Sequence, residues 1–116
     1  MFSENRSTVI LITRQGMGEA EQPLPMNLLR TYLTLLRDSD SLPEAICFYT
    51  EGVKLLVAGS PVLDLLQAIE AKGVHLILCS TCLNFYGLMD QVQAGIVGGM
   101  ADIIETQRRA DKVINL

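Results

Sequence analysis

The sequence lacks most of the features that assign a function at once. Among its 116 residues there are one histidine, three cysteines, no tryptophan and only nine lysines and arginines, and the formal net charge is −4. The basic residues are spread along the chain, and only Arg108 and Arg109 are adjacent. Because no basic stripe is available to neutralise phosphates, we expect no nucleic-acid partner.

Long apolar runs are also missing. The longest, such as residues 9–12 and 75–79, are far too short to cross a bilayer, and the polar start of the chain lacks the apolar segment of a signal peptide. We therefore expect a cytoplasmic protein with no membrane partner. In that reducing compartment, three cysteines indicate free thiols rather than a disulfide framework.

The sequence does contain enough apolar material for a core. Apolar residues make up 49% of the chain and charged residues 19%, which is typical of one folded domain of this length. We expect a single domain over 1–116, with a poorly ordered N-terminus at 1–7. The mean hydropathy of +0.31 is high for a small monomer, so we expect some apolar surface to pack against another copy.

Strand-like and helix-like patterns alternate along the chain. The predicted strands are 8–13, 44–50, 74–79 and 112–115, and the predicted helices are 26–38, 59–73, about 82–92 and 100–110. In the second helix, Ser60 is the expected N-cap, Pro61 the first helical residue and Gly73 the end. The alternation predicts an α/β fold with a parallel sheet and right-handed crossovers.

Two cysteines fall where such sheets place their sites, beyond the carboxyl ends of the strands. Cys79 ends the third strand just before a helix, and Cys82 follows after Ser80 and Thr81. Amide groups at the start of a helix favour negative charge, and the thiolate is the nucleophilic form of cysteine.

A pair of cysteines with two residues between them suits three chemistries. The pair could exchange between dithiol and disulfide, bind half of a zinc site, or carry sulfur as a persulfide. Zinc needs four ligands, and the remaining candidates, Cys47 and His75, are predicted within strands, with Cys47 as packing. We expect no metal and no cofactor.

Residues 73–90, "GVHLILCSTCLNFYGLMD", resemble the DsrE/DsrF-like proteins, and most closely the C-terminal domain of YedF-type sulfurtransferases. In those proteins the third strand ends in Cys-Gly-Thr-Cys-Leu, followed by an aromatic residue, Gly and Leu. The likeness extends to "GMG" at 16–18, to 51–74 and to 97–116. The present chain differs at Ser80, where the related pattern has glycine.

The resemblance implies a three-layer α/β/α sandwich with a mostly parallel sheet of four to five strands, which often assembles as dimers, trimers or hexamers. It also implies sulfur relay through a persulfide. In the relay members the active cysteine lies eight residues before a glycine, as Cys79 lies before Gly87. Cys82 matches the second cysteine of one subgroup, and its role is left open between resolving and protecting the persulfide.

The leading hypothesis is a cytoplasmic, homo-oligomeric sulfur carrier or sulfurtransferase-like protein that exchanges sulfur with a separate donor or acceptor protein. Cys79 is the expected nucleophile and Cys82 its neighbour. The expected substrate-binding residues are Gly16, Met17, Gly18, Gly52, Val53, Lys54, Ser80 and Thr81. Lys54 either holds an anionic sulfur or is simply solvated. Two alternatives remain: a non-catalytic binding or assembly subunit, and a dithiol–disulfide oxidoreductase.

Overall fold

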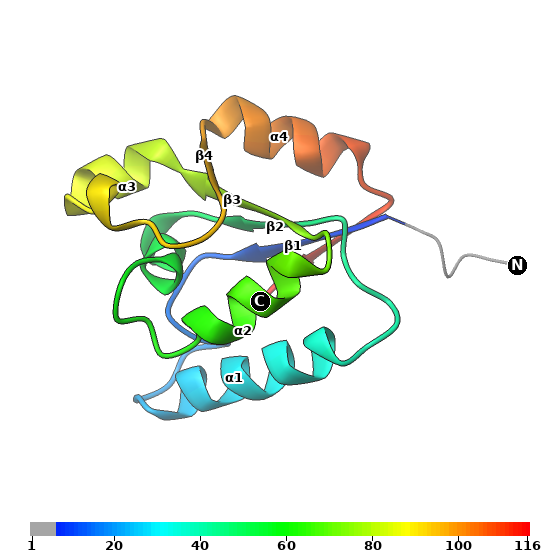
Figure 1. Ribbon diagram of the computed structural model, residues 1–116, viewed down its shortest axis with the longest axis horizontal. Coiled ribbons are helices and arrows are strands. Elements are labelled where there is room, and N and C mark those ends of the chain that lie inside the picture. The colour runs from blue at the N-terminus through cyan, green and yellow to red at the C-terminus, as the bar shows by residue number, and fades with distance from the viewer. Residues whose placement is uncertain (1–6) are drawn as a thin grey trace, which may run out of the picture.

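The structure, a computed structural model, describes residues 7–116, and its strands form one sheet (Figure 1). The strands are β1 (Thr8–Ile12), β2 (Ala45–Phe48), β3 (His75–Cys79), β4 (Ile96–Gly98) and β5 (Lys112–Asn115). Their order across the sheet is β4-β3-β2-β1-β5, and every neighbouring pair is parallel. The predicted parallel sheet is confirmed.

Helices cover both faces of this sheet. They are α1 (Leu24–Arg37), α2 (Leu63–Ala71), α3 (Ser80–Tyr86) and α4 (Met100–Arg109), with short 3₁₀ helices at Thr50–Leu56 and Met89–Gln91. In Figure 1, α1 and α2 lie side by side under one face, α4 crosses the other, and α3 continues from the end of β3. The three-layer sandwich is therefore confirmed as well.

The core lies on the two central strands and follows from their composition. All four residues of β2 are buried, as are four of the five residues of β1, because each strand is covered on both faces. Leu11, Cys47 and Ile77 are aligned across β1, β2 and β3, so their side chains share one face of the sheet. Helix α4 covers this face, because a side chain at Gly98 would contact both Ile77 of β3 and Asp102 of α4.

The predicted start of α2 is wrong. The helix begins at Leu63, and its N-cap is Val62 rather than Ser60. Residues 60–63 form a turn instead, in which the amide of Val62 donates to Oγ of Ser60 and the amide of Leu63 donates to the carbonyl of Ser60. Ser60 therefore stabilises a turn before the helix, which serine hydroxyls also favour, and Pro61 lies in that turn rather than at the first helical position.

The helix expected at about 82–92 is shorter and begins earlier. It starts at Ser80, directly after β3, and stops at Tyr86 because Gly87 adopts a left-handed conformation with φ 66°. Glycine tolerates this conformation at a helix end. The early start matters for the site, because it places Cys82 in the first turn of α3.

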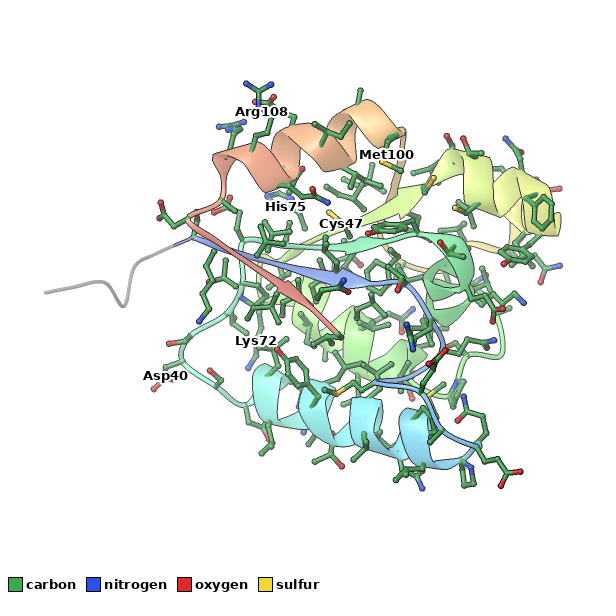
Figure 2. All side chains as sticks on the ribbon, turned by 180° about the vertical axis from the view of Figure 1, so that it is seen from behind. Asp40, Cys47, Lys72, His75, Met100 and Arg108 are labelled. Carbon is green, nitrogen blue, oxygen red and sulfur yellow. The ribbon has the colours of Figure 1, made fainter. Side chains whose placement is uncertain are left out.

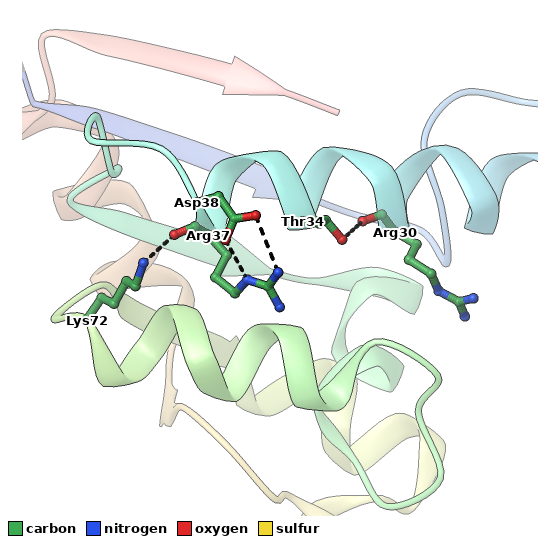
Figure 3. A network of polar contacts seen from close by, with 5 residues as sticks. All are labelled: Arg30, Thr34, Arg37, Asp38 and Lys72. Carbon is green, nitrogen blue, oxygen red and sulfur yellow. Dashed lines mark hydrogen bonds and ion pairs between the residues drawn. The ribbon is translucent and has the colours of Figure 1, made fainter.

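Polar contacts join the C-terminal ends of α1 and α2 (Figure 3). Lys72 donates through Nζ to the backbone carbonyl of Arg37, and Arg37 forms an ion pair with Asp38 at 3.0 Å. Within α1, Thr34 donates to the carbonyl of Arg30 at 2.8 Å. The contacts of Lys72, Arg37 and Asp38 lie at the opposite end of the sheet from Cys79 and Cys82.

The expected disorder at 1–7 falls mostly outside the described residues, which begin at Ser7. The backbone amide of Ser7 donates to Asp111, just before β5. Within residues 7–116 no helix is both long enough and apolar enough to cross a membrane.

Candidate thiol site

Cys79 lies at the carboxyl edge of the sheet, because it is the last residue of the apolar strand β3. Cys79 is the last residue of β3, pairs with Gly98 of β4 and is the N-cap of α3. Because side chains alternate along a strand, Cys79 shares the α4 face with Ile77. Its side chain is only 2% exposed, so the thiol lies just beneath the surface.

Cys82 lies in the first turn of α3, three residues after Cys79, so the two side chains are on one side of that turn. It is half-buried and more accessible than Cys79. Its Sγ accepts a hydrogen bond from the backbone amide of Thr50, with a donor–acceptor distance of 3.0 Å. The end of β2 is thereby joined to the start of α3 through a sulfur atom.

The electrostatic environment keeps the proton on Cys82. Burial is the main cause that raises the pKa of the Cys82 thiol; the Thr50 amide lowers it, while a side-chain hydrogen bond with Cys79 and the charge of Cys79 raise it further. The net direction is upward. The raised pKa favours the protonated thiol of Cys82.

Thr50 reaches Cys82 because the chain turns sharply after β2. Thr50 has φ 52°, a left-handed conformation that a β-branched residue adopts rarely. Gly52 then passes so close to β1 that a Cβ there would overlap the carbonyl oxygen of Ile12. The turn is thus held against the end of β1 by a contact that only glycine permits.

The predicted rim residues after β1 form a loop that packs on α1. Gly16 is buried, Gly18 is exposed, and the amide of Met17 donates to the carbonyl of Pro25 at 2.9 Å. The loop also reaches the turn after β2, since Gln15 donates to the carboxylate of Glu51 at 3.1 Å. The loops after β1 and β2 are therefore joined at the same edge of the sheet.

The remaining predicted binding residues differ in exposure. Val53 is fully buried, Ser80 is half-buried and Thr81 is exposed. The ammonium group of Lys54 lies 4.3 Å from the centre of the Tyr86 ring, a cation–π contact. Both residues line a hollow of about 370 Å³ together with residues 57–61.

Cys47 and His75 lie apart from this edge, between the sheet and α4 (Figure 2). Cys47 is fully buried in the middle of β2, and burial raises the pKa of its thiol to about 11. His75 is exposed at the start of β3, at the opposite end from Cys79. Among residues 7–116 no group of three or more His, Cys, Asp or Glu side chains is arranged to hold a metal ion.

Two contributors were missed by sequence reasoning. Thr50 acts through its backbone amide, which any residue except proline carries, so its type gives no signal. The sequence does contain a signal for Tyr86, because this residue lies four positions after Cys82 and therefore on the same side of α3.

The comparisons with known proteins agree with this architecture. The family model described as "DsrE/DsrF-like family" matches residues 8–116. The chain belongs to the DsrE/DsrF-like family. The resemblance noted at residues 73–90 is thereby confirmed for the family, which is associated with sulfur relay.

Three solved structures share the DsrE/DsrF-like fold. The YchN protein of E. coli is 20% identical with a TM-score of 0.73, and the alignment covers 96% of this chain and 99% of that one. MTH1491 of Methanobacterium thermoautotrophicum, a protein of unknown function, is 20% identical with a TM-score of 0.71 and 97% and 100% coverage. BT1422 of Bacteroides thetaiotaomicron, also of unknown function, is 18% identical with a TM-score of 0.72 and 100% and 99% coverage.

No curated protein sequence matched the chain. At 18–20% identity, the structural likeness establishes the fold and leaves the chemistry to the residues of this chain.

Proposed function

We propose that this DsrE/DsrF-like protein carries sulfane sulfur as a persulfide on Cys79, in the cytoplasm, where such thiols are kept reduced. The observation that carries the proposal is the position of Cys79. It ends β3, an interior strand, at the carboxyl edge of the sheet, close in the chain to a second thiol whose sulfur accepts a backbone N–H. Catalytic and carrier groups of parallel α/β folds are found at this edge.

The loading step conserves sulfur and electrons. The Cys79 thiolate attacks the outer sulfur of a persulfide R–S–SH, a bond forms between the two sulfur atoms, and the old S–S bond breaks. Its electron pair leaves with R–S⁻, and Cys79 becomes Cys79–S–SH. The reverse of this step passes the sulfur to an acceptor thiolate, so neither direction needs a metal or an external oxidant.

The hollow lined by Lys54 and Tyr86 gives the proposal a docking place for the donor or acceptor. Lys54 is held over the ring of Tyr86, which lies on the same side of α3 as Cys82. A cation at this place suits the carboxylate or sulfur anion of a persulfide-bearing partner. Gly18 and Thr81, both exposed, follow β1 and β3 at the same edge of the sheet.

Intact-mass spectrometry after incubation with a low-molecular-weight persulfide tests the proposal. Wild-type protein should gain about 32 Da, the mass of one sulfur atom on a thiol. Cys79→Ser should gain nothing, whereas Cys47→Ala, the matched control, should load like wild type. An unmodified wild type would favour a non-catalytic binding or assembly subunit instead, and equal loading of Cys79→Ser would show that another cysteine takes up the sulfur.

The closeness of the two thiols also favours a second candidate, a dithiol–disulfide oxidoreductase. Cys79 and Cys82 are three residues apart, at the end of β3 and in the first turn of α3. A redox titration distinguishes the candidates: an oxidoreductase would form a reversible Cys79–Cys82 disulfide with a potential of about −120 to −270 mV. A sulfur carrier would instead load sulfur before any disulfide appears.

We further propose that the protein is a homo-oligomer. Several apolar side chains next to the edge strand β4 are exposed: Phe85 at 81%, Ile96 at 62%, Ile104 at 48% and Met100 at 47%. An edge strand with exposed apolar side chains is a usual place for association. Light scattering should show more than one copy for wild type and a monomer for Ile96→Lys, with Val113→Lys on the opposite edge strand as the control. A wild-type monomer at tens of micromolar would contradict this.

A further inference from the structure

The hydrogen bond from Thr50 to Cys82 constrains what Cys82 can do. A thiol is both a weak acceptor through its sulfur and a weak donor through its S–H. The Thr50 amide approaches Sγ of Cys82 to 3.0 Å and uses the acceptor side. The S–H of Cys82 is therefore free to donate, and Cys79 is the sulfur that lies on its side of the helical turn.

The backbone conformation of Thr50 points to the same contact independently. A β-branched residue with φ 52° is strained, and glycine would adopt this conformation without cost. Such strain is typically kept where the surrounding structure uses it. Here the strained residue is the one whose amide holds Cys82.

The two thiols also differ in exposure. Cys79 is 2% exposed and Cys82 is half-buried. Burial is the main cause that raises the pKa of Cys82, which favours its protonated form. A buried thiolate without a nearby donor is costly, and Cys82 supplies that donor.

We propose that Cys82 is a positioning residue that donates its S–H to the sulfur of Cys79, held in this orientation by the N–H of Thr50, and that Cys82 neither stores sulfur nor forms a disulfide during transfer. This inference rests on the proposed function of Cys79. It replaces the two roles left open by the sequence, resolving and protecting the persulfide, with a third.

The transfer step shows where the donor matters. When an acceptor thiolate attacks the outer sulfur of Cys79–S–SH, the S–S bond breaks and its electron pair goes to Sγ of Cys79. The Cys82 S–H hydrogen-bonds to this developing thiolate and keeps its own proton. The sulfane sulfur leaves on the acceptor, so no electron or proton remains unaccounted for.

The test is a thiolate titration of Cys79 by ultraviolet absorbance, which needs no sulfur donor. In a Cys47→Ala background, Cys82→Ser and Cys82→Ala each leave Cys79 as the one thiol. Serine keeps an acceptor oxygen for the Thr50 amide and an O–H donor, whereas alanine keeps neither. The Cys79 titration should lie about one pH unit higher in Cys82→Ala than in Cys82→Ser, which corresponds to about a tenfold loss of thiolate at neutral pH.

Sulfur transfer provides the second readout. Discharge of preloaded protein to a small acceptor thiol should slow about tenfold in Cys82→Ala and be largely restored in Cys82→Ser. Cys82→Val fills the space of the thiol but has no donor, so it should behave like Cys82→Ala. It therefore controls for the cavity that the alanine substitution leaves.

Two results would overturn the inference. If Cys79 titrates at the same pH in Cys82→Ala as in Cys82→Ser, no donated hydrogen bond acts on Cys79. A transfer rate equally lost in both variants, with a Cys79–Cys82 disulfide trapped in wild type, would show that the sulfur of Cys82 itself reacts. If Cys79 accepts no sulfur at all, the proposed function fails, while the titration still decides whether Cys82 is a donor.

Discussion

Cys47 and Cys79 lie on neighbouring parallel strands and on the same face of one sheet, yet their surroundings differ. Cys47 is in the middle of β2, fully buried, and burial raises its pKa to about 11. Cys79 is at the end of β3, where the chain turns into α3 and where a second thiol and a backbone amide are close.

The difference shows that position along a strand separates a thiol enclosed in the core from a thiol at the edge of the sheet. In the middle of β2, both neighbouring strands pair with the backbone, and the Cys47 side chain belongs to the hydrophobic core. Beyond the last strand residue, amides are free to contact side chains, as Thr50 contacts Cys82.

The largest effect is expected from Gly52→Ala, which would break the environment of the strand-end pair. The added methyl group would overlap the carbonyl of Ile12, so the turn that carries Thr50 would have to move. We expect a loss of about 2–4 kcal/mol in the free energy of unfolding, measured by urea denaturation. Gly99→Ala is the matched control, because Gly99 has φ −99° and the nearest atom to a Cβ there is 3.9 Å away, an ordinary contact. Equal losses in the two variants would argue against the close approach.

Cys47 offers a test of the packing thiol. Its pKa is raised from 9.0 to about 11 in the folded protein, so above pH 9 the unfolded chain loses a proton that the folded chain retains. The stabilising effect is complete below pH 9 and is lost as the pH rises towards 11. Urea denaturation of Cys47→Ala should show a weaker decline over this window than wild type. Parallel declines would contradict the burial of Cys47.

The smallest expected effect comes from Thr50→Gly, which keeps the amide but removes the strain. The free energy of unfolding should rise by up to about 1 kcal/mol, since relief of the left-handed conformation exceeds the entropy that glycine adds to the unfolded chain. Thr50→Ala, which removes only the β-branch, should fall between Thr50→Gly and wild type. A destabilised Thr50→Gly would mean that the threonine side chain, and not the backbone, supports the turn.

The sheet, its parallel direction and the helices were predictable because their signals are local and periodic. The apolar runs at 8–13 and 74–79 match β1 and β3 within one residue. Cys79 was expected at the end of a strand, and its position there is confirmed, while its role stays a prediction. Cys47 was correctly expected to be buried. The start of α2 was not predictable with certainty, because Ser60 and Pro61 favour a turn as readily as a helix start.

The immediate surroundings of the thiols could not be predicted, because they depend on backbone groups and on contacts between distant segments. The amide of Thr50 lies 32 residues from Cys82 in the chain, and the sequence contains no signal for its left-handed φ. The close approach of Gly52 to Ile12 likewise appears only when β1 and β2 are side by side. Residue type indicated the candidate thiols, and the fold shows that they differ in burial.

Site-resolved peptide mapping tests the central claim most directly. Wild-type protein is incubated with a low-molecular-weight persulfide, its thiols and persulfides are blocked by alkylation, and the peptides that contain Cys47, Cys79 and Cys82 are compared by mass. The account predicts one added sulfur, about 32 Da, on Cys79 and none on the other two cysteines. Sulfur found on Cys82 with Cys79 unmodified would contradict it.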